Sequence, residues 1–220
     1  MKNNRIKILF SKFLLKYFGR FCPKDLFNRI LEMEGFEIGV GTYFFDPNNV
    51  QIDRQRPWML KIGEYCKITS GVTILTHDYS RSVLRRAYGE IIGEAKMTTI
   101  GNNVFIGVNS IILMGTQIGD NVIIGAGSVV GGHIPDNVVV AGNPAKVVRT
   151  LEEHYNRRKQ VVVKEAKNWF DSYKDRYGHY PSEKQAGPFF PLFTSRESFD
   201  YSTDKRLTMG KKKLGTVDLI

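Results

Sequence analysis

Residues 99–130 read TIGNNVFIGVNSIILMGTQIGDNVIIGAGSVV, and an aliphatic side chain recurs in them at every sixth position. The anchors of this repeat are Ile100, Ile106, Ile112, Ile118, Ile124 and Val130. Glycine follows every anchor except Ile112, and the same register places Ile62, Ile68 and Ile74 further upstream. A period of six matches neither the 3.6-residue period of a helix nor the two-residue period of a strand. The repeat therefore indicates a structural unit of six residues that is neither a helix nor a simple strand.

A six-residue unit fits a short extended segment followed by a bend, with the anchor pointing inward and a small residue easing the turn. Three units close one triangular coil, and stacked coils pair each strand with those above and below it. The position four residues after an anchor should also be small or apolar. It holds Cys66, Val72, Val104, Ser110, Thr116, Val122, Ser128 and Ile134, and the exception is Asp78, where the pattern stops. We therefore predict a mainly β chain folded as a parallel β-helix prism.

The N-terminal region is strongly basic and is predicted to be helical. Residues 1–30 hold eight Lys or Arg residues against Asp25 alone, a net charge of +7, whereas residues 31–145 carry −3. The apolar side chains of residues 6–21 fall on one helical stripe, formed by Ile6, Leu9, Phe10, Phe13, Leu14, Tyr17 and Phe21. This stripe either packs on the prism or the base of an assembly, or makes a peripheral membrane contact through residues 1–21. The slightly acidic central body argues against a nucleic-acid partner.

Three segments are predicted along the chain. They are a basic helical segment over residues 1–34, the prism over 35–149 with an inserted loop at 80–97, and a C-terminal helix and extended arm over 150–220. The insertion is predicted because the register breaks between Ile74 and Ile100. The helix should end near Gly178, because residues 151–177 are rich in charge and contain neither glycine nor proline. No apolar run is long enough to span a bilayer and only two cysteines are present, so we expect a cytoplasmic protein.

Three blocks of the sequence carry a family resemblance. They are IGEYCKITSGVTILTHDYS (62–80), the repeat over 99–130, and IPDNVVVAGNPAKVVR (134–149). They resemble the hexapeptide-repeat acyltransferases, in particular the sugar and polysaccharide O-acetyltransferases of the maltose and galactoside group. The resemblance implies a left-handed coil and a homotrimer with active sites between subunits. It also implies acetyl-CoA as the co-substrate and no metal.

The chemistry of such an enzyme points to a histidine. Transfer of an acyl group from a thioester to a hydroxyl needs a base near neutral pH, and histidine titrates there. Of the four histidines, His133 lies in the final loop of the prism, and His154 and His179 lie in the C-terminal extension. His77 stands where the coil gives way to the insertion, which is also where the family has its histidine. We therefore predict His77 as the general base.

Further site residues follow from position and from the resemblance. At the mouth of the insertion Tyr79 and Arg81 are placed to meet an acceptor, and Asp78 either does the same or serves as a turn residue. The resemblance implies that the acceptor also meets Phe105, which replaces a frequent tryptophan of the family. It implies that CoA contacts Gly107, Val108, Gly125, Ala126, Lys146 and Arg149. Backbone N–H groups around Gly107 and Val108 would face the thioester oxygen.

The function predicted from these residues is O-acetylation of a sugar hydroxyl. The basic N-terminus and long C-terminal arm favour a surface or capsular polysaccharide, or its lipid-linked precursor, at the inner face of the membrane. The alternatives are acetylation of a small molecule, such as an amino acid, amino sugar or drug, and a non-catalytic scaffold prism. A metal-dependent hydratase of the γ-carbonic anhydrase type needs three clustered histidines, which the spacing of His77 and His133 does not provide.

Overall fold

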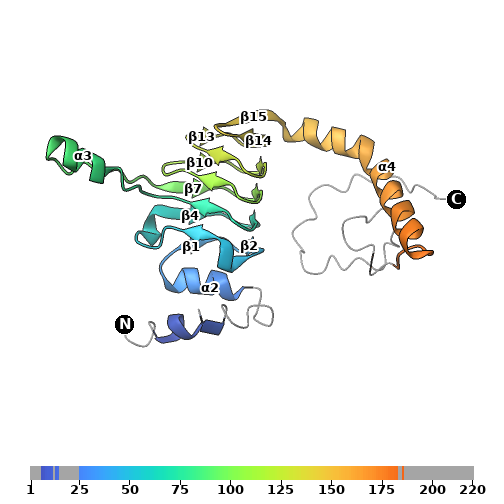
Figure 1. The fold of residues 1–220 in the computed structure, drawn as a ribbon, viewed down its shortest axis with the longest axis horizontal. Coiled ribbons are helices and arrows are strands. Elements are labelled where there is room, and N and C mark those ends of the chain that lie inside the picture. Colours follow the sequence, from blue (N-terminus) through green and yellow to red (C-terminus); the bar gives the residue numbers. More distant parts are fainter. Residues whose placement is uncertain (1–5, 12, 15–24, 183–184, 186–220) are drawn as a thin grey trace. The chain divides into compact units, whose positions relative to one another are not determined.

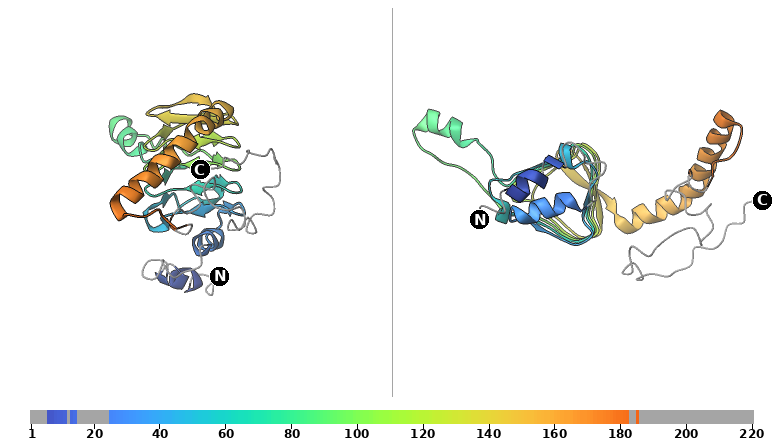
Figure 2. Two further views of the ribbon diagram at one scale, coloured as in Figure 1. Left: turned by 90° about the vertical axis from the view of Figure 1, so that its right-hand side faces the viewer. Right: turned by 90° about the horizontal axis from the view of Figure 1, so that it is seen from below.

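The computed structural model describes residues 6–11, 13–14, 25–182 and 185. The chain divides into two compact units, Met1–His154 and Tyr155–Ile220. The first unit contains three sheets, which form the three sides of a prism. Seen along the stack, the strands outline a triangle (Figure 2, right). The predicted prism with parallel sheets is therefore confirmed.

The strands of successive coils lie side by side in each sheet (Figure 1). Sheet A has the order β1 (Glu37–Ile38), β4 (Leu60–Ile62), β7 (Thr98–Ile100), β10 (Gln117–Ile118) and β13 (His133–Ile134). Sheet B has the order β2 (Tyr43–Phe44), β5 (Lys67–Ile68), β8 (Phe105–Ile106), β11 (Ile123–Ile124), β14 (Val138–Gly142) and β15 (Ala145–Thr150). Sheet C has the order β3 (Gln51–Ile52), β6 (Thr73–Ile74), β9 (Ile111–Ile112) and β12 (Val129–Val130). Only the pair β14 and β15 is antiparallel among these strands of the described chain.

The anchors predicted from the period of six form the core. All nine are at most 4% exposed, and the predicted position-four residues are buried with them. The register extends one coil further upstream than the sequence suggested, since Ile38, Phe44 and Ile52 pair with Ile62, Ile68 and Ile74. Ile134 differs from the other position-four residues because it pairs with Ile118 and so acts as an anchor of sheet A.

A short helix closes the N-terminal end of the prism. Helix α2 (Leu26–Met33) lies below β1 and β2 in Figure 1. It buries Phe27, Ile30 and Leu31, and the ring of Phe27 meets that of Phe44 edge to face at 4.9 Å between centroids. Without this cover the first coil would expose its apolar interior to water. Two 3-10 turns, η2 (Pro47–Asn49) and η3 (Pro57–Met59), lie on either side of β3.

Most of the described part of the basic N-terminal stripe is exposed, and only Leu14 is half-buried. Residues 6–11, 13 and 14 are helical, as predicted. Ile6, Leu9 and Phe10 are 66%, 67% and 60% exposed, so these three side chains do not pack on the prism of their own chain. Tyr17 and Phe21, which were predicted to continue the stripe, lie outside the described residues.

The insertion at 80–97 is not a simple loop, which corrects the sequence prediction. It contains helix α3 (Arg81–Tyr88), which ends at Gly89 in the left-handed conformation with φ +78°. No residue of α3 is buried, and the helix lies at the end of an arm that projects from the prism (Figures 1 and 2). The returning strand is fixed at the prism, because the Lys96 N–H donates to the Thr76 carbonyl at 2.9 Å.

One long helix begins in the last residues of the first unit and continues into the C-terminal unit. Helix α4 (Leu151–Tyr177) ends beside Gly178, as predicted. A capping box starts it, in which the Thr150 N–H donates to Glu153 Oε2 and the Glu153 N–H donates to Thr150 Oγ1. The extended arm predicted after Gly178 lies almost wholly outside the described residues. None of the helices in the described ranges combines the length and apolar character needed to cross a bilayer.

Candidate active site

His77 lies at the corner of the prism that leads from sheet C to sheet A. It follows β6 by three residues and is the last residue of the coil before the arm begins. An isolated bridge pairs it with Ala95 on the returning strand. Its side chain is 22% exposed, which leaves the ring partly accessible from outside the prism.

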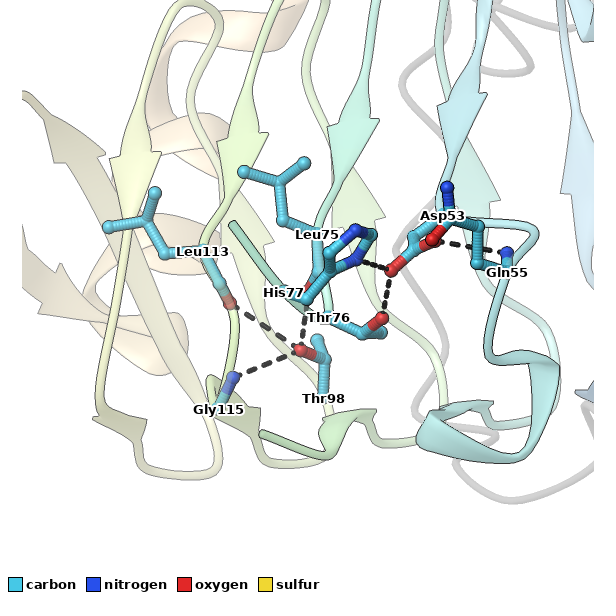
Figure 3. A network of polar contacts seen from close by, with 8 residues as sticks. All are labelled: Asp53, Gln55, Leu75, Thr76, His77, Thr98, Leu113 and Gly115. Atoms are coloured by element: carbon cyan, nitrogen blue, oxygen red, sulfur yellow. Dashed lines mark hydrogen bonds and ion pairs between the residues drawn. The ribbon is translucent and has the colours of Figure 1, made fainter. Parts of the chain in front are cut away.

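The partner of His77 is Asp53, from the coil below (Figure 3). Asp53 follows Ile52 directly, and Ile52 is in register with Ile74 of the next coil. The two chain segments therefore turn at the same corner, where the side chains of Asp53 and His77 meet. Asp53 Oδ2 contacts both His77 Nδ1 and Thr76 Oγ1, while Oδ1 accepts the Gln55 N–H at 3.1 Å. The Asp53 side chain is only 5% exposed. The corner therefore holds a buried carboxylate against the Nδ1 edge of a partly exposed imidazole.

The contacts of Asp53 keep its carboxylate ionised. Burial by itself raises the pKa of Asp53, but hydrogen bonds from Thr76, the Gln55 N–H and His77 outweigh that effect, so the pKa lies below its ordinary value. An ionised carboxylate can only accept, so His77 Nδ1 carries the hydrogen of this pair. The neutral imidazole then has its lone pair on Nε2, which no described residue contacts by a hydrogen bond. This nitrogen can accept a proton.

A polar network fixes the backbone just before His77 (Figure 3). Thr98 Oγ1 donates to the Leu75 carbonyl at 2.8 Å and accepts the Gly115 N–H at 3.2 Å. Thr98 is fully buried, so these hydrogen bonds are shielded from water. Because they link Leu75 to both ends of the following coil, they limit movement of the chain that carries His77.

The predicted acceptor residues of the insertion lie at its mouth. Asp78 Oδ1 accepts the N–H and the hydroxyl of Ser80, which is the turn role considered for it. Tyr79 and Arg81 are exposed, and the Arg81 guanidinium lies 4.9 Å from the centroid of the Tyr79 ring. These residues begin the arm immediately after His77.

The residues predicted to contact CoA gather at a second corner, between sheets B and C. A Cβ on Gly107 would lie 2.6 Å from the Ala126 nitrogen, and one on Gly125 would lie 2.9 Å from the Ala141 Cβ. Small residues are therefore required by the stacking of the coils. The Gly107 N–H donates to the Ile124 carbonyl at 2.9 Å, so it is engaged within the chain. Val108 is exposed, and its N–H has no hydrogen-bond partner among the described residues.

The two predicted basic residues lie on the last strand. Lys146 pairs with Ala141, which adjoins Gly125, so it lies beside the corner between sheets B and C. Arg149 pairs with Val139, further along β15. This corner and the corner of His77 are opposite edges of sheet C. A single chain thus separates the predicted CoA residues from the predicted base.

Phe105 faces outward from sheet B, away from both corners. It lines a groove of about 250 Å³ together with Tyr65, Lys67, Asn121 and Leu151, and His77 is not part of this lining. Within one chain the structure therefore does not bring Phe105 and His77 together.

The other histidines take no part in the pair. His133 lies in β13, and not in a loop as predicted, because the final coil is shortened and places it opposite Gln117 on sheet A. His154 belongs to α4, and His179 follows that helix. Within the described ranges no three His, Cys, Asp or Glu residues cluster as a metal site would require.

The sequence matches known proteins over the same region. Residues 97–132 match the family described as bacterial transferase hexapeptide (six repeats). Over 144 residues the chain is 40% identical to Protein CapG of Staphylococcus aureus, a match that covers 66% of this chain and 80% of CapG. The chain belongs to the hexapeptide-repeat acyltransferase family.

Two further similarities agree with this family. The chain is 37% identical over 124 residues to galactoside O-acetyltransferase of Escherichia coli (strain K12), covering 55% of this chain and 59% of that enzyme. A solved hexapeptide-repeat containing acetyltransferase from Vibrio cholerae covers 68% of this chain and 92% of its own, with a TM-score of 0.50 and 19% identity. The latter supports the fold. These relatives, where their names state an activity, are acetyltransferases. This hexapeptide-repeat protein is therefore an acetyltransferase as well.

Proposed function

We propose that the chain transfers an acetyl group from acetyl-CoA to a sugar hydroxyl, with His77 as the general base. The observation that carries the proposal is the contact between Asp53 and His77 Nδ1 at the corner of sheets C and A. Similarity to a galactoside O-acetyltransferase supports a sugar hydroxyl as the acceptor. The family resemblance also favours a left-handed coil.

The pair can manage the proton of the reaction. His77 Nε2 accepts the hydroxyl proton while the hydroxyl oxygen forms a bond to the thioester carbonyl carbon. Asp53 remains ionised and stabilises the imidazolium that results, because its carboxylate faces the opposite nitrogen. When the carbon–sulfur bond breaks, His77 returns the proton to the departing sulfur. The ring is then neutral again, and no proton is left over.

The corner between sheets B and C suits an extended thioester co-substrate. The stacked glycines leave a surface without protruding side chains, and the free Val108 N–H can donate to a carbonyl oxygen there. Lys146 and Arg149 follow on β15 and provide positive charge for phosphate groups. These residues would hold acetyl-CoA.

A second copy of the chain would complete the site. Because the CoA corner and the His77 corner lie at opposite edges of sheet C, copies packed corner to corner bring one chain's Gly125 and Val108 near the other chain's His77. Three copies packed in this way would form a closed ring, in which each copy contacts the other two. This supports a homotrimer with active sites between subunits. Acetyl transfer by a monomer would overturn that arrangement.

The basic N-terminal region supports a proposal for the acceptor and for where in the cell the protein acts. The exposed side chains of Ile6, Leu9 and Phe10, together with the net charge of +7 in residues 1–30, support contact with an anionic membrane surface. An enzyme held there would act on a surface or capsular polysaccharide, or on its lipid-linked precursor, at the cytoplasmic face.

A turnover assay tests this function. Release of CoA from acetyl-CoA is measured with glycans, free sugars, an amino sugar and serine as acceptors, for the wild type and for His77→Ala. We expect sugars to be acetylated on oxygen in a reaction that requires His77. A preference for serine or for the amino group of the amino sugar would instead favour the small-molecule alternative. Absence of acetyl transfer to any acceptor would favour a scaffold.

A further inference from the structure

Six polar side chains are buried in the described part of the chain. They are Thr42, Thr76, Thr98, Ser110, Thr116 and Ser128. A hydroxyl group in an apolar interior needs a hydrogen-bond acceptor from the protein, because it has lost its water. Five of these hydroxyls donate to backbone carbonyls, as Thr116 Oγ1 does to Leu113 at 2.6 Å and Ser110 Oγ does to Gly125 at 3.0 Å. These five therefore bind the backbone of the stacked coils.

Thr76 is different, because its hydroxyl meets a side-chain carboxylate. Thr76 is fully buried, and its Oγ1 contacts Asp53 Oδ2 (Figure 3). Since the carboxylate of Asp53 is ionised, the hydroxyl donates and the carboxylate oxygen accepts. The same Oδ2 atom contacts His77 Nδ1. A buried side chain and its partly exposed neighbour in the sequence thus meet one oxygen atom.

The two oxygens of Asp53 are held by different parts of the chain. Oδ1 accepts the Gln55 N–H at 3.1 Å, which belongs to the same loop as Asp53. Oδ2 contacts Thr76 and His77, which lie on the following coil. In the described chain, Thr76 is therefore the residue besides His77 that ties this carboxylate to the coil of the histidine. Without its hydroxyl, the orientation of Oδ2 toward Nδ1 would depend on the histidine alone.

The same hydrogen bond affects the ionisation of Asp53. Burial raises the pKa of Asp53, and the hydrogen bond from Thr76 is the largest of the effects that lower it. A donor to the ionised form of a carboxyl favours that form. The Thr76 hydroxyl thus helps Asp53 remain an acceptor for the Nδ1 hydrogen, which leaves the lone pair of the neutral ring on Nε2.

We propose that Thr76 is a positioning residue, whose hydroxyl holds Asp53 Oδ2 against His77 Nδ1 and so fixes the ring with its lone pair on Nε2. The inference rests on the proposed acetyl transfer and adds a third residue to the pair. Thr76 does not meet the substrates, because its side chain is fully buried. Its loss should therefore slow the chemical step and leave the binding of acetyl-CoA and acceptor as it is.

The test removes the hydroxyl and keeps the branched shape of the side chain. Valine matches threonine in branching but cannot donate a hydrogen bond. Thr76→Val should lower kcat by about tenfold to 100-fold with both KM values retained, the range for losing a hydrogen bond to a charged group. Thr76→Ser keeps the donor and should retain most of the turnover. The matched control is Thr116→Val, which removes a fully buried hydroxyl bonded to the Leu113 and Val130 carbonyls and should leave kcat unchanged.

A double variant shows whether Thr76 acts through Asp53. In an Asp53→Asn background the carboxylate is already gone, so Thr76→Val should lower kcat no further. Losses that add in the double variant, or an equal loss in Thr116→Val, would mean that Thr76 only supports packing, and either result overturns the proposal. Wild-type kcat in a folded Thr76→Val protein overturns it as well. Should the valine variants fail to fold, Thr76→Ala and Thr116→Ala make the same comparison.

A measurement without turnover separates this proposal from the proposed function. The carboxyl carbon of Asp53 is followed by NMR against pH in the protein without substrates. Thr76→Val should raise the pKa of Asp53, because a donor to its ionised form is lost, whereas Thr116→Val should leave that pKa as in the wild type. An unchanged pKa in Thr76→Val overturns the positioning role while the acetyl transfer stands. If the pKa rises but no acceptor is acetylated in a His77-dependent reaction, the proposed function is wrong, and with it the reaction that Thr76 would serve.

Discussion

Replacement of Asp53 by asparagine isolates the role of the buried carboxylate. The amide has nearly the same shape, so the contacts of Thr76 and the Gln55 N–H can persist. Toward His77 Nδ1, however, the change removes a charge and can present a donor where an acceptor stood. The imidazole then favours the form with its hydrogen on Nε2, which cannot accept a proton. We expect kcat to fall by about 10²–10⁴, which corresponds to about 3–5 kcal/mol of barrier.

The assay is CoA release under saturating acetyl-CoA and acceptor, with thermal unfolding as the check on folding. His77→Ala provides the background for a double-mutant cycle. If Asp53 acts through His77, adding Asp53→Asn to His77→Ala should reduce turnover no further, because the two residues work as one unit. Near-normal turnover by a folded Asp53→Asn protein would refute the reasoning, and so would losses that simply add in the double variant.

Three other predictions concern folding, acid pH and the N-terminal stripe. Ile124→Asp places an unpaired charge at a fully buried anchor and should abolish cooperative unfolding, whereas Gln117→Asp on the outer face should not; equal thermal transitions of the two would show that the register is wrong. The lowered pKa of Asp53 means that its contacts add stability above the pKa of an unfolded carboxyl, about 4, and lose it as the pH falls through the lower folded value. The difference in Tm between wild type and Asp53→Asn should therefore shrink below about pH 4, and a difference that grows on acidification would contradict the assigned direction. Replacing Leu9 and Phe10 together by aspartate should reduce sedimentation with phosphatidylserine vesicles at low salt, while phosphatidylcholine vesicles should bind neither form. Equal sedimentation of variant and wild type would remove the membrane contact.

The prism was predictable because each coil repeats the same local rule. An aliphatic anchor every six residues, with small residues at the turns, specifies the core without long-range information, as the burial of Ile106 and Ile124 shows. Helix α4 was equally predictable, since a capping box marks its start and Gly178 marks its end. The helix in the arm was missed because α3 has only eight residues and buries none of its side chains, so neither its length nor the register of the core marked it in the sequence.

Asp53 could not be predicted as a site residue because the first anchors are irregularly spaced. His77 is conspicuous because it stands at the end of the regular repeat. Asp53 lies in the first coils, where the anchors Phe44, Ile52 and Ile62 are separated by eight and ten residues instead of six. The added residues are in the turns, so the strands still align and Asp53 comes to lie against the later coil. Extending the register backward with turn insertions allowed would have placed Ile52 under Ile74 and Asp53 beside the corner.

Acetyl transfer by His77→Ala tests the central claim most directly, namely that His77 is the base of an acetyl-CoA-dependent transfer to a sugar hydroxyl. Turnover is measured with the best acceptor of the wild type, together with the oligomer mass, Tm and affinity for CoA of both proteins. We predict turnover lower by about 10²–10⁴ with mass, Tm and CoA affinity retained, the loss typical of a missing general base. Near-normal transfer by the intact variant would contradict the account.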